Sequence, residues 1–182
     1  MSKLYVYIMR SRNKDNTCVS RFKERCKTMV KYEDEEELIL KEFKNFAKDG
    51  VKGERSRLYK SVNARDEDKV RKGFIIKMFK DEPSITKTNR ILSSVAQCTE
   101  NRAESKWLFD FDNKDCSLLN SFLADVCCIS NDDDIIDVCK DTPNGFAVVV
   151  KHGFDTRELM NKYKQYVTLK KDEMLFLDIM EA

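Results

Sequence analysis

Two aspartates separated by one residue follow a short aromatic run, and they are the residues best suited to carry chemistry. The run covers residues 106–113 and reads Lys-Trp-Leu-Phe-Asp-Phe-Asp-Asn, which places carboxylates at Asp110 and Asp112. On a β-strand these two would share one face while the aromatic residues anchor the other. Like charges this close repel unless a cation lies between them, and such oxygen ligands suit Mg²⁺ or Mn²⁺. The alternative is a strand that runs out into a solvated Asp-Asn turn.

A third carboxylate, Asp178, lies in the otherwise apolar run of residues 175–179. A buried and unpaired charge costs several kcal/mol, so Asp178 should face water, meet a cation or belong to a site. Three carboxylates on the strands of one sheet could hold two metal ions for phosphoryl transfer. In that hypothesis Asp110, Asp112 and Asp178 are both the catalytic residues and the metal ligands.

The segments that would position these carboxylates predict an α+β fold with an antiparallel sheet. Strand-forming residues dominate four segments, namely 107–112, 135–139, 146–151 and 174–179. Apolar residues at helical spacing follow the first and third of them. The order βαββαβ, with one extra short strand at 167–169, is that of ferredoxin-like and RNA-recognition-motif-like folds. In that topology the Asp110 strand pairs with residues 146–151 on one side and with the last strand on the other.

The turn between the second and third of these strands reads Asp-Thr-Pro-Asn-Gly over residues 141–145. This composition predicts a hairpin in which Asn144 and Gly145 supply positive φ angles.

The N-terminal part of the chain predicts a small α/β extension over residues 1–54, before a core at 57–180, within one domain of 1–182. A strand at 3–9 and a helix at 34–48 are the clearest elements, whereas residues 17–32 fit either a strand or a helix. Two further helices follow a strand at 57–65, the first capped by Asp66. Their spaced apolar residues predict ordinary core faces; these residues are Val70, Phe74, Ile75, Phe79, Ile85, Ile91, Leu92 and Val95.

Three short motifs, in order, resemble those of the archaeo-eukaryotic primase superfamily, which includes primase-polymerases. Residues 108–112 resemble its apolar-Asp-x-Asp motif, residues 142–149 its second motif near a hairpin, and residues 177–178 its apolar-Asp motif. Residues 57–65 are similar to strands that precede the catalytic half in phage-type members. The resemblance implies a nucleotidyltransferase that uses two Mg²⁺ or Mn²⁺ ions, with Asn144, Lys151 and Arg65 contacting nucleotides or single-stranded nucleic acid.

One position departs from the family pattern. The second-motif histidine of the family, which contacts nucleotide phosphate, falls at Ala147, and alanine cannot do that chemistry. The single histidine, His152, has the opposite strand parity, whereas Lys151 shares the face of Ala147. The chain is therefore either a divergent enzyme or a protein that keeps the sheet without turnover. For His152 an exposed turn residue is the simpler interpretation, as is a solvated strand face for Arg57, Lys60 and Arg65, and a solvated loop for residues 132–134.

Composition limits the remaining classes. The 182 residues are 36% charged with a net charge of only +2, so no global basic field argues for nucleic acid. Seven cysteines without metal-binding or disulfide spacing, and no signal peptide or long apolar run, predict reduced thiols in a cytoplasmic protein without a membrane segment. Besides the enzyme, two hypotheses stay open: a nucleic-acid-binding module with exposed aromatic residues, and a phage-type protein-interaction module with an exposed apolar patch.

Overall fold

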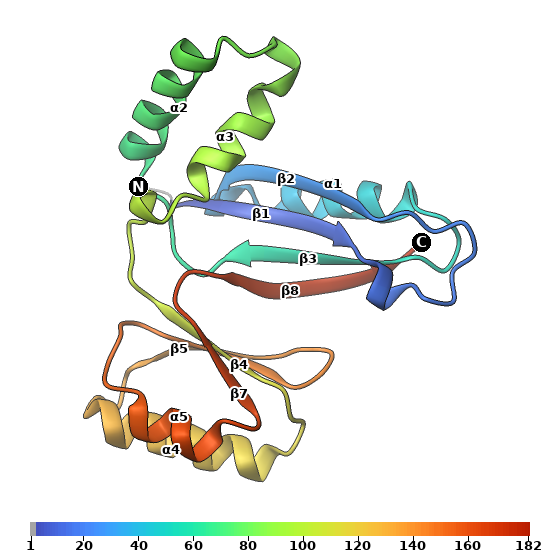
Figure 1. Cartoon of the computed structure of the whole chain (residues 1–182). Helices are drawn as coiled ribbons and strands as arrows, with labels where there is room; N and C mark the ends of the chain where they lie inside the picture. The colour runs from blue at the N-terminus through green and yellow to red at the C-terminus, as the bar shows by residue number, and fades with distance from the viewer. Residues whose placement is uncertain (1–2) are drawn as a thin grey trace. The chain divides into compact units, whose positions relative to one another are not determined.

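The computed structural model describes residues 3–182 and divides the chain into two compact units (Figure 1). Unit 1 comprises Met1–Ala103 and Phe176–Ala182, and unit 2 comprises Glu104–Leu175. Each unit is built on a four-stranded sheet, so the chain is α+β. Short 3-10 turns occur at Asn13–Asp15, Glu33–Glu35, Ile85–Lys87 and Thr99–Asn101.

The sheet of unit 1 has the strand order β2-β1-β3-β8. These strands are β2 (Arg25–Tyr32), β1 (Leu4–Ser11), β3 (Arg55–Ser61) and β8 (Met174–Glu181). Both faces are covered, because Tyr5, Tyr7 and Met9 of β1 pack with α1 (Glu36–Lys48), whereas Leu4 and Val6 pack with the opposite layer. That opposite layer consists of the antiparallel helices α2 (Glu67–Asp81) and α3 (Thr88–Ala96), and their hairpin extends past the sheet in Figure 1. As predicted, Asp66 caps α2 by accepting a hydrogen bond from the Lys69 amide at 3.0 Å.

Unit 2 has the element order βαββαβ and the sheet order β5-β6-β4-β7. Its elements are β4 (Trp107–Phe111), α4 (Cys116–Ser130), β5 (Ile136–Asp141), β6 (Phe146–Val150), α5 (Arg157–Tyr163) and β7 (Val167–Lys170). The two helices lie together on one face of this sheet (Figure 1). The arrangement is compatible with a ferredoxin-like fold.

An aromatic cluster forms the core between the sheet and helices of unit 2. Phe109 and Phe111 of β4 are fully buried and contact the Phe122 ring of α4, with ring centroids 5.4 and 5.5 Å apart. Tyr163 of α5 packs edge-on against the same ring at 5.1 Å. The predicted alternation of β4 is therefore confirmed: its aromatic residues anchor the strand, and Asp110 lies on the opposite face.

The structure corrects the predicted strand neighbours. The last strand, β8, does not pair with β4; its neighbour is β3 in the sheet of unit 1. The position beside β4 is taken by β7, the short strand that the sequence suggested was an extra element, through the Cα pairs Asp110–Thr168 and Phe109–Leu169. Val167 and Leu169 point into the core of unit 2, so β7 forms the edge strand of this sheet with only four residues. The predicted boundary between residues 54 and 57 also falls inside unit 1, at the start of β3.

Two local predictions are also corrected. Neither Asn144 nor Gly145 has a positive φ angle. The helical face that was expected to be core is buried only at Val70 in α2, whereas Ile75, Ile76 and Phe79 are exposed. The apolar residues of α2 are thus distributed around the helix, and only some of them are buried against α3 and the sheet. Within that range, no helix is long and apolar enough to cross a membrane.

Candidate functional site

Asp110 lies at the centre of the unit 2 sheet, on the face opposite the helices. Its side chain is 32% exposed and accepts a hydrogen bond from Lys170 Nζ, at 2.7 Å from Oδ2. The Lys170 side chain, from the end of β7, is 34% exposed. The carboxylate that was predicted to be a metal ligand is thus already neutralised by an ammonium group.

The strand register defines a row of side chains across this face. Lys140 of β5 is the Cα partner of Ala147, Ala147 is the partner of Asp110, and Asp110 is the partner of Thr168. Ala147, at the position of the family histidine, therefore lies directly beside Asp110. The row contains one carboxylate and no imidazole.

Asp112 lies one residue beyond the end of β4, in the loop that leads to α4. Its main-chain amide donates to Tyr166 O at 2.7 Å, and its side chain is exposed. No hydrogen bond or ion pair of the Asp112 carboxylate to another residue in 3–182 is present. Asp112 therefore keeps a carboxylate available for a cation or a ligand.

Asp178 belongs to a different sheet. It lies on β8 in unit 1, and one of its carboxylate oxygens accepts a hydrogen bond from the Ile179 amide at 2.8 Å. The predicted triad therefore does not come from the strands of one sheet. Among residues 3–182, no group of three or more His, Cys, Asp or Glu side chains could hold a metal ion. Within unit 2, Asp110 and Asp112 are thus the two predicted metal ligands that one strand and the loop after it supply.

The hairpin that carries Asn144 approaches the end of β4 closely. Asn144 is exposed, and Gly145 is buried against the backbone at the end of β4. A Cβ atom at Gly145 would lie 1.9 Å from Phe111 O and 2.7 Å from Asn113 N, which no side chain tolerates. The glycine therefore serves close backbone approach and not a positive φ angle.

Lys151 and His152 follow β6 and are held by the loop between α4 and β5. Lys151 Nζ pairs with Asp134 Oδ2, and His152 Nε2 lies 3.2 Å from Asp132 Oδ2. The hydrogen bond to Asp134 raises the pKa of Lys151. The pKa of Asp132 is lowered, mainly by the hydrogen bond from the Asp134 amide and then by the hydrogen bond with His152. Lys151, predicted to contact substrate, is thus engaged in a loop ion pair.

Arg65, also predicted to contact substrate, is a buried residue of unit 1. It is 5% exposed, and its main-chain amide donates to Leu4 O at 2.7 Å. Two basic residues of the preceding strand, Arg57 and Lys60, have carboxylate partners. Arg57 pairs with Asp15 at 2.6 Å, and Lys60 pairs with Glu33 at 2.8 Å.

Sequence reasoning missed two features. Lys170 was not among the predicted site residues; β7 pairs it with Leu108, on the same face of the sheet as Asp110, and its ammonium group donates a hydrogen bond to Asp110. The other is the exposed apolar patch of Ile75, Ile76, Phe79 and Ile85 along the second half of α2 and the turn before α3, with Phe79 80% and Ile85 87% exposed. Helical periodicity marked Ile75, Phe79 and Ile85 as core residues, but it could not show that they are exposed. The chain matches no family model, and searches of curated proteins and of solved structures also find no match.

Proposed function

We propose that unit 2 is a ferredoxin-like module that binds nucleotides or single-stranded nucleic acid without turning them over. The proposal rests on one observation, the hydrogen bond between Lys170 and Asp110. Asp110 lies in the row formed by Lys140, Ala147, Asp110 and Thr168 across the face of the sheet. An ammonium group that is hydrogen-bonded to a carboxylate about one third exposed can exchange it for a phosphate oxygen at small cost, because such surface pairs contribute only about 0.2–1 kcal/mol.

The resemblance to primase-polymerases supports the ligand class and not the reaction. Asp110, in the stretch that resembles the first motif, lies on a central strand beside Ala147, in the stretch that resembles the second motif. The missing imidazole and the separate sheet of Asp178 both argue against turnover. The aromatic residues of β4 lie in the core, so phosphate contacts are favoured over base stacking on this face.

Isothermal titration calorimetry of the full chain with dATP and with oligo-dT tests the proposal, with and without Mg²⁺ or Mn²⁺. We expect metal-independent binding that weakens with salt, is lost in Lys170→Gln, and is retained or strengthened in Asp110→Asn. The matched control is Lys162→Gln, which removes a comparable exposed ion pair, with Asp125, within the same unit.

The same titration separates binding from catalysis. A divergent nucleotidyltransferase that uses Asp110, Asp112 and Asp178 would require Mg²⁺ or Mn²⁺ for nucleotide binding and would lose it in Asp110→Asn. Metal-dependent primer synthesis by the wild-type chain would contradict the proposal directly. No binding of either ligand by the folded protein would exclude both nucleic-acid functions.

A second candidate function, protein interaction, is favoured by the apolar patch on the second half of α2 and the turn before α3. Ile75, Ile76, Phe79 and Ile85 are each at least 46% exposed, and an exposed apolar cluster of this kind is typical of interaction surfaces. Affinity purification of a tagged chain from its own cells, compared with Phe79→Asp, tests this function. A partner that is retained equally by the variant would exclude the patch.

A further inference from the structure

The outer edge of β2 is open for hydrogen bonding. β2 is the first strand of the order β2-β1-β3-β8, so among residues 3–182 only its inner edge is paired with another strand. The Glu33 amide donates to Lys3 O, so Lys3 and Glu33 form a hydrogen-bonded pair next to the β1–β2 ladder. This pair determines which of the following residue pairs along β1 and β2 are hydrogen-bonded and which are not. Because antiparallel pairs alternate, the main-chain groups of Cys26, Thr28 and Val30 then point away from β1. Val6, the partner of Val30, agrees with this alternation, because its amide points away from β2 and donates to Ser61 Oγ at 3.1 Å.

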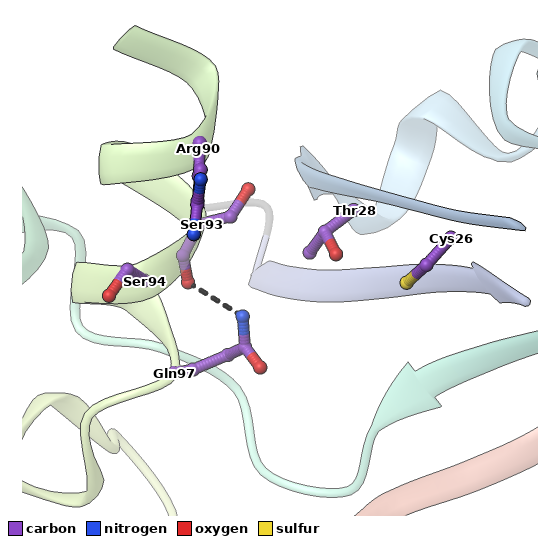
Figure 2. Close-up of a pocket in the computed structure, with 6 residues that line it drawn as sticks. All are labelled: Cys26, Thr28, Arg90, Ser93, Ser94 and Gln97. Carbon is purple, nitrogen blue, oxygen red and sulfur yellow. Dashed lines mark hydrogen bonds between the residues drawn. The ribbon is translucent and has the colours of Figure 1, made fainter. Parts of the chain in front are cut away.

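A groove follows this edge. One hollow of about 530 Å³ lies between β2 and α3, lined by Cys26, Thr28, Arg90, Ser93, Ser94 and Gln97. Figure 2 shows Cys26 and Thr28 on the strand facing the helix that carries Arg90 and Ser93, with Gln97 held by a 3.0 Å hydrogen bond to Ser93 O.

A second hollow of about 380 Å³ extends the groove along residues 27–31 of β2. It shares Thr28 and Ser93 with the first, and it reaches Leu38 and Glu42 of α1 on the other side of the strand. The groove therefore contains the exposed backbone of an edge strand between two helices. This shape accepts an extended chain, since a strand added to an edge projects alternate side chains to the two sides.

The charges of the groove indicate which extended chain it fits. Lys27 and Lys31 are compensated by Glu42 and Glu35. Arg90, in the α3 wall, has no ion-pair partner within the described chain. The α3 side thus presents an uncompensated guanidinium among polar groups, whereas the α1 side presents the apolar Leu38 and Met29. A complementary strand alternates acidic or polar residues with apolar ones.

A second copy of this chain fits poorly at the same edge. Antiparallel pairing of β2 with itself must match the outward-facing residues with each other. In the central registers this places Arg25 opposite Lys31, Lys27 opposite Lys27, or Lys27 opposite Lys31. Like charges directly opposite on adjacent strands are destabilising. The lysines on this edge also fit the general use of charge to prevent edge-to-edge pairing.

We propose that the groove along β2 binds an extended, acidic segment of a partner protein by β-strand addition. The partner backbone pairs with Cys26, Thr28 and Val30, and an acidic side chain pairs with Arg90. This site is separate from the sheet of unit 2 and does not depend on nucleotide binding.

Fluorescence polarisation of the full chain with a labelled Asp-Val-Thr-Val-Asp-Val peptide tests the proposal. We expect saturable binding, with binding about tenfold weaker in Thr28→Pro, since proline removes an outward amide while the ladder to β1 remains. N-methylation of one alternate set of peptide amides should abolish binding, whereas methylation of the other set should not. The melting temperature of Thr28→Pro confirms that the variant is folded.

Charge reversal provides an independent readout. Arg90→Glu should bind the Asp peptide about tenfold more weakly and prefer the same peptide with Lys in place of Asp, whereas Lys164→Glu on unit 2 should change neither. No saturable binding to the wild-type chain would overturn the proposal, as would equal binding of both N-methylated peptides. A concentration-dependent dimer that Thr28→Pro dissociates would also overturn it, because the occupant would then be a second copy.

Discussion

Lys170 Nζ lies 2.7 Å from Asp110 Oδ2, so that one ion pair joins the edge strand β7 to the central strand β4 of unit 2. Both side chains are about one third exposed, and water therefore screens the attraction between them. A double-mutant cycle with Asp110→Asn and Lys170→Gln should give a coupling free energy of about 0.5 kcal/mol. Urea denaturation of the four proteins measures it.

A small coupling energy is what the proposed ligand exchange requires. If the cycle instead gave about 3 kcal/mol, the pair would be a stabilising element of unit 2, and Lys170 would not be released to a phosphate at small cost.

Gly145→Ala should destabilise unit 2 strongly. The added Cβ would lie 1.9 Å from Phe111 O, and backbone atoms cannot move aside as a flexible side chain would. We expect a loss of about 3 kcal/mol in the free energy of unfolding, measured by thermal or urea denaturation. The control is Asn144→Ala at the exposed neighbouring position, which should change stability by about 0.5 kcal/mol or less. Equal effects of the two substitutions would mean that the hairpin does not approach β4 this closely.

Glu54 gives unit 1 an acid-sensitive ion pair. Its side chain is 2% exposed and bonds Arg25 Nε at 2.9 Å. Burial alone would raise the pKa of Glu54, but the hydrogen bonds from Arg25 and the Val51 amide lower it below its ordinary value of 4.5. A carboxyl group whose pKa is lower in the folded state stabilises the protein above its unfolded pKa. That contribution is lost as the pH falls below 4.5 and through the folded pKa.

Glu54→Gln should therefore lower the free energy of unfolding by about 2–3 kcal/mol at neutral pH, since it leaves the Arg25 guanidinium without its carboxylate. The difference from the wild type should shrink as the pH falls below 4.5. Urea denaturation midpoints between about pH 7 and about pH 3 measure both effects. A difference that stays constant with pH would show that the loss comes from packing and not from charge.

The local elements were predictable from the sequence because their signals are local. The alternation of β4, the Asp66 cap and the helical spacing of α1 each depend on residues that are close together in the sequence. The order βαββαβ followed from them. That the Asp110 strand neighbours residues 146–151 followed in turn from this order, whereas the pairing of Asp110 with Ala147 is seen only in the structure.

The pairing of β8 was not predictable in the same way. Its run of apolar residues fits either sheet, and its neighbour β3 lies more than a hundred residues earlier in the chain. Which edge it joins depends on competition between β7 and β8, and no local pattern encodes that. The error moved Asp178 into the wrong sheet. Lys170 was missed for the same reason, because its role depends on β7 closing unit 2.

A last prediction concerns Phe79 on the exposed face of α2, and it tests whether this residue is uncovered in solution. Phe79 is 80% exposed, so Phe79→Ala should change the free energy of unfolding by about 0.5 kcal/mol or less. Phe43 of α1, fully buried in the same unit, is the matched control, and Phe43→Ala should cost about 3–5 kcal/mol. Urea denaturation compares the two. A loss of about 2 kcal/mol or more for Phe79→Ala would mean that another surface covers this residue in solution, and sedimentation of the wild type and variant would then show whether that surface is a second copy.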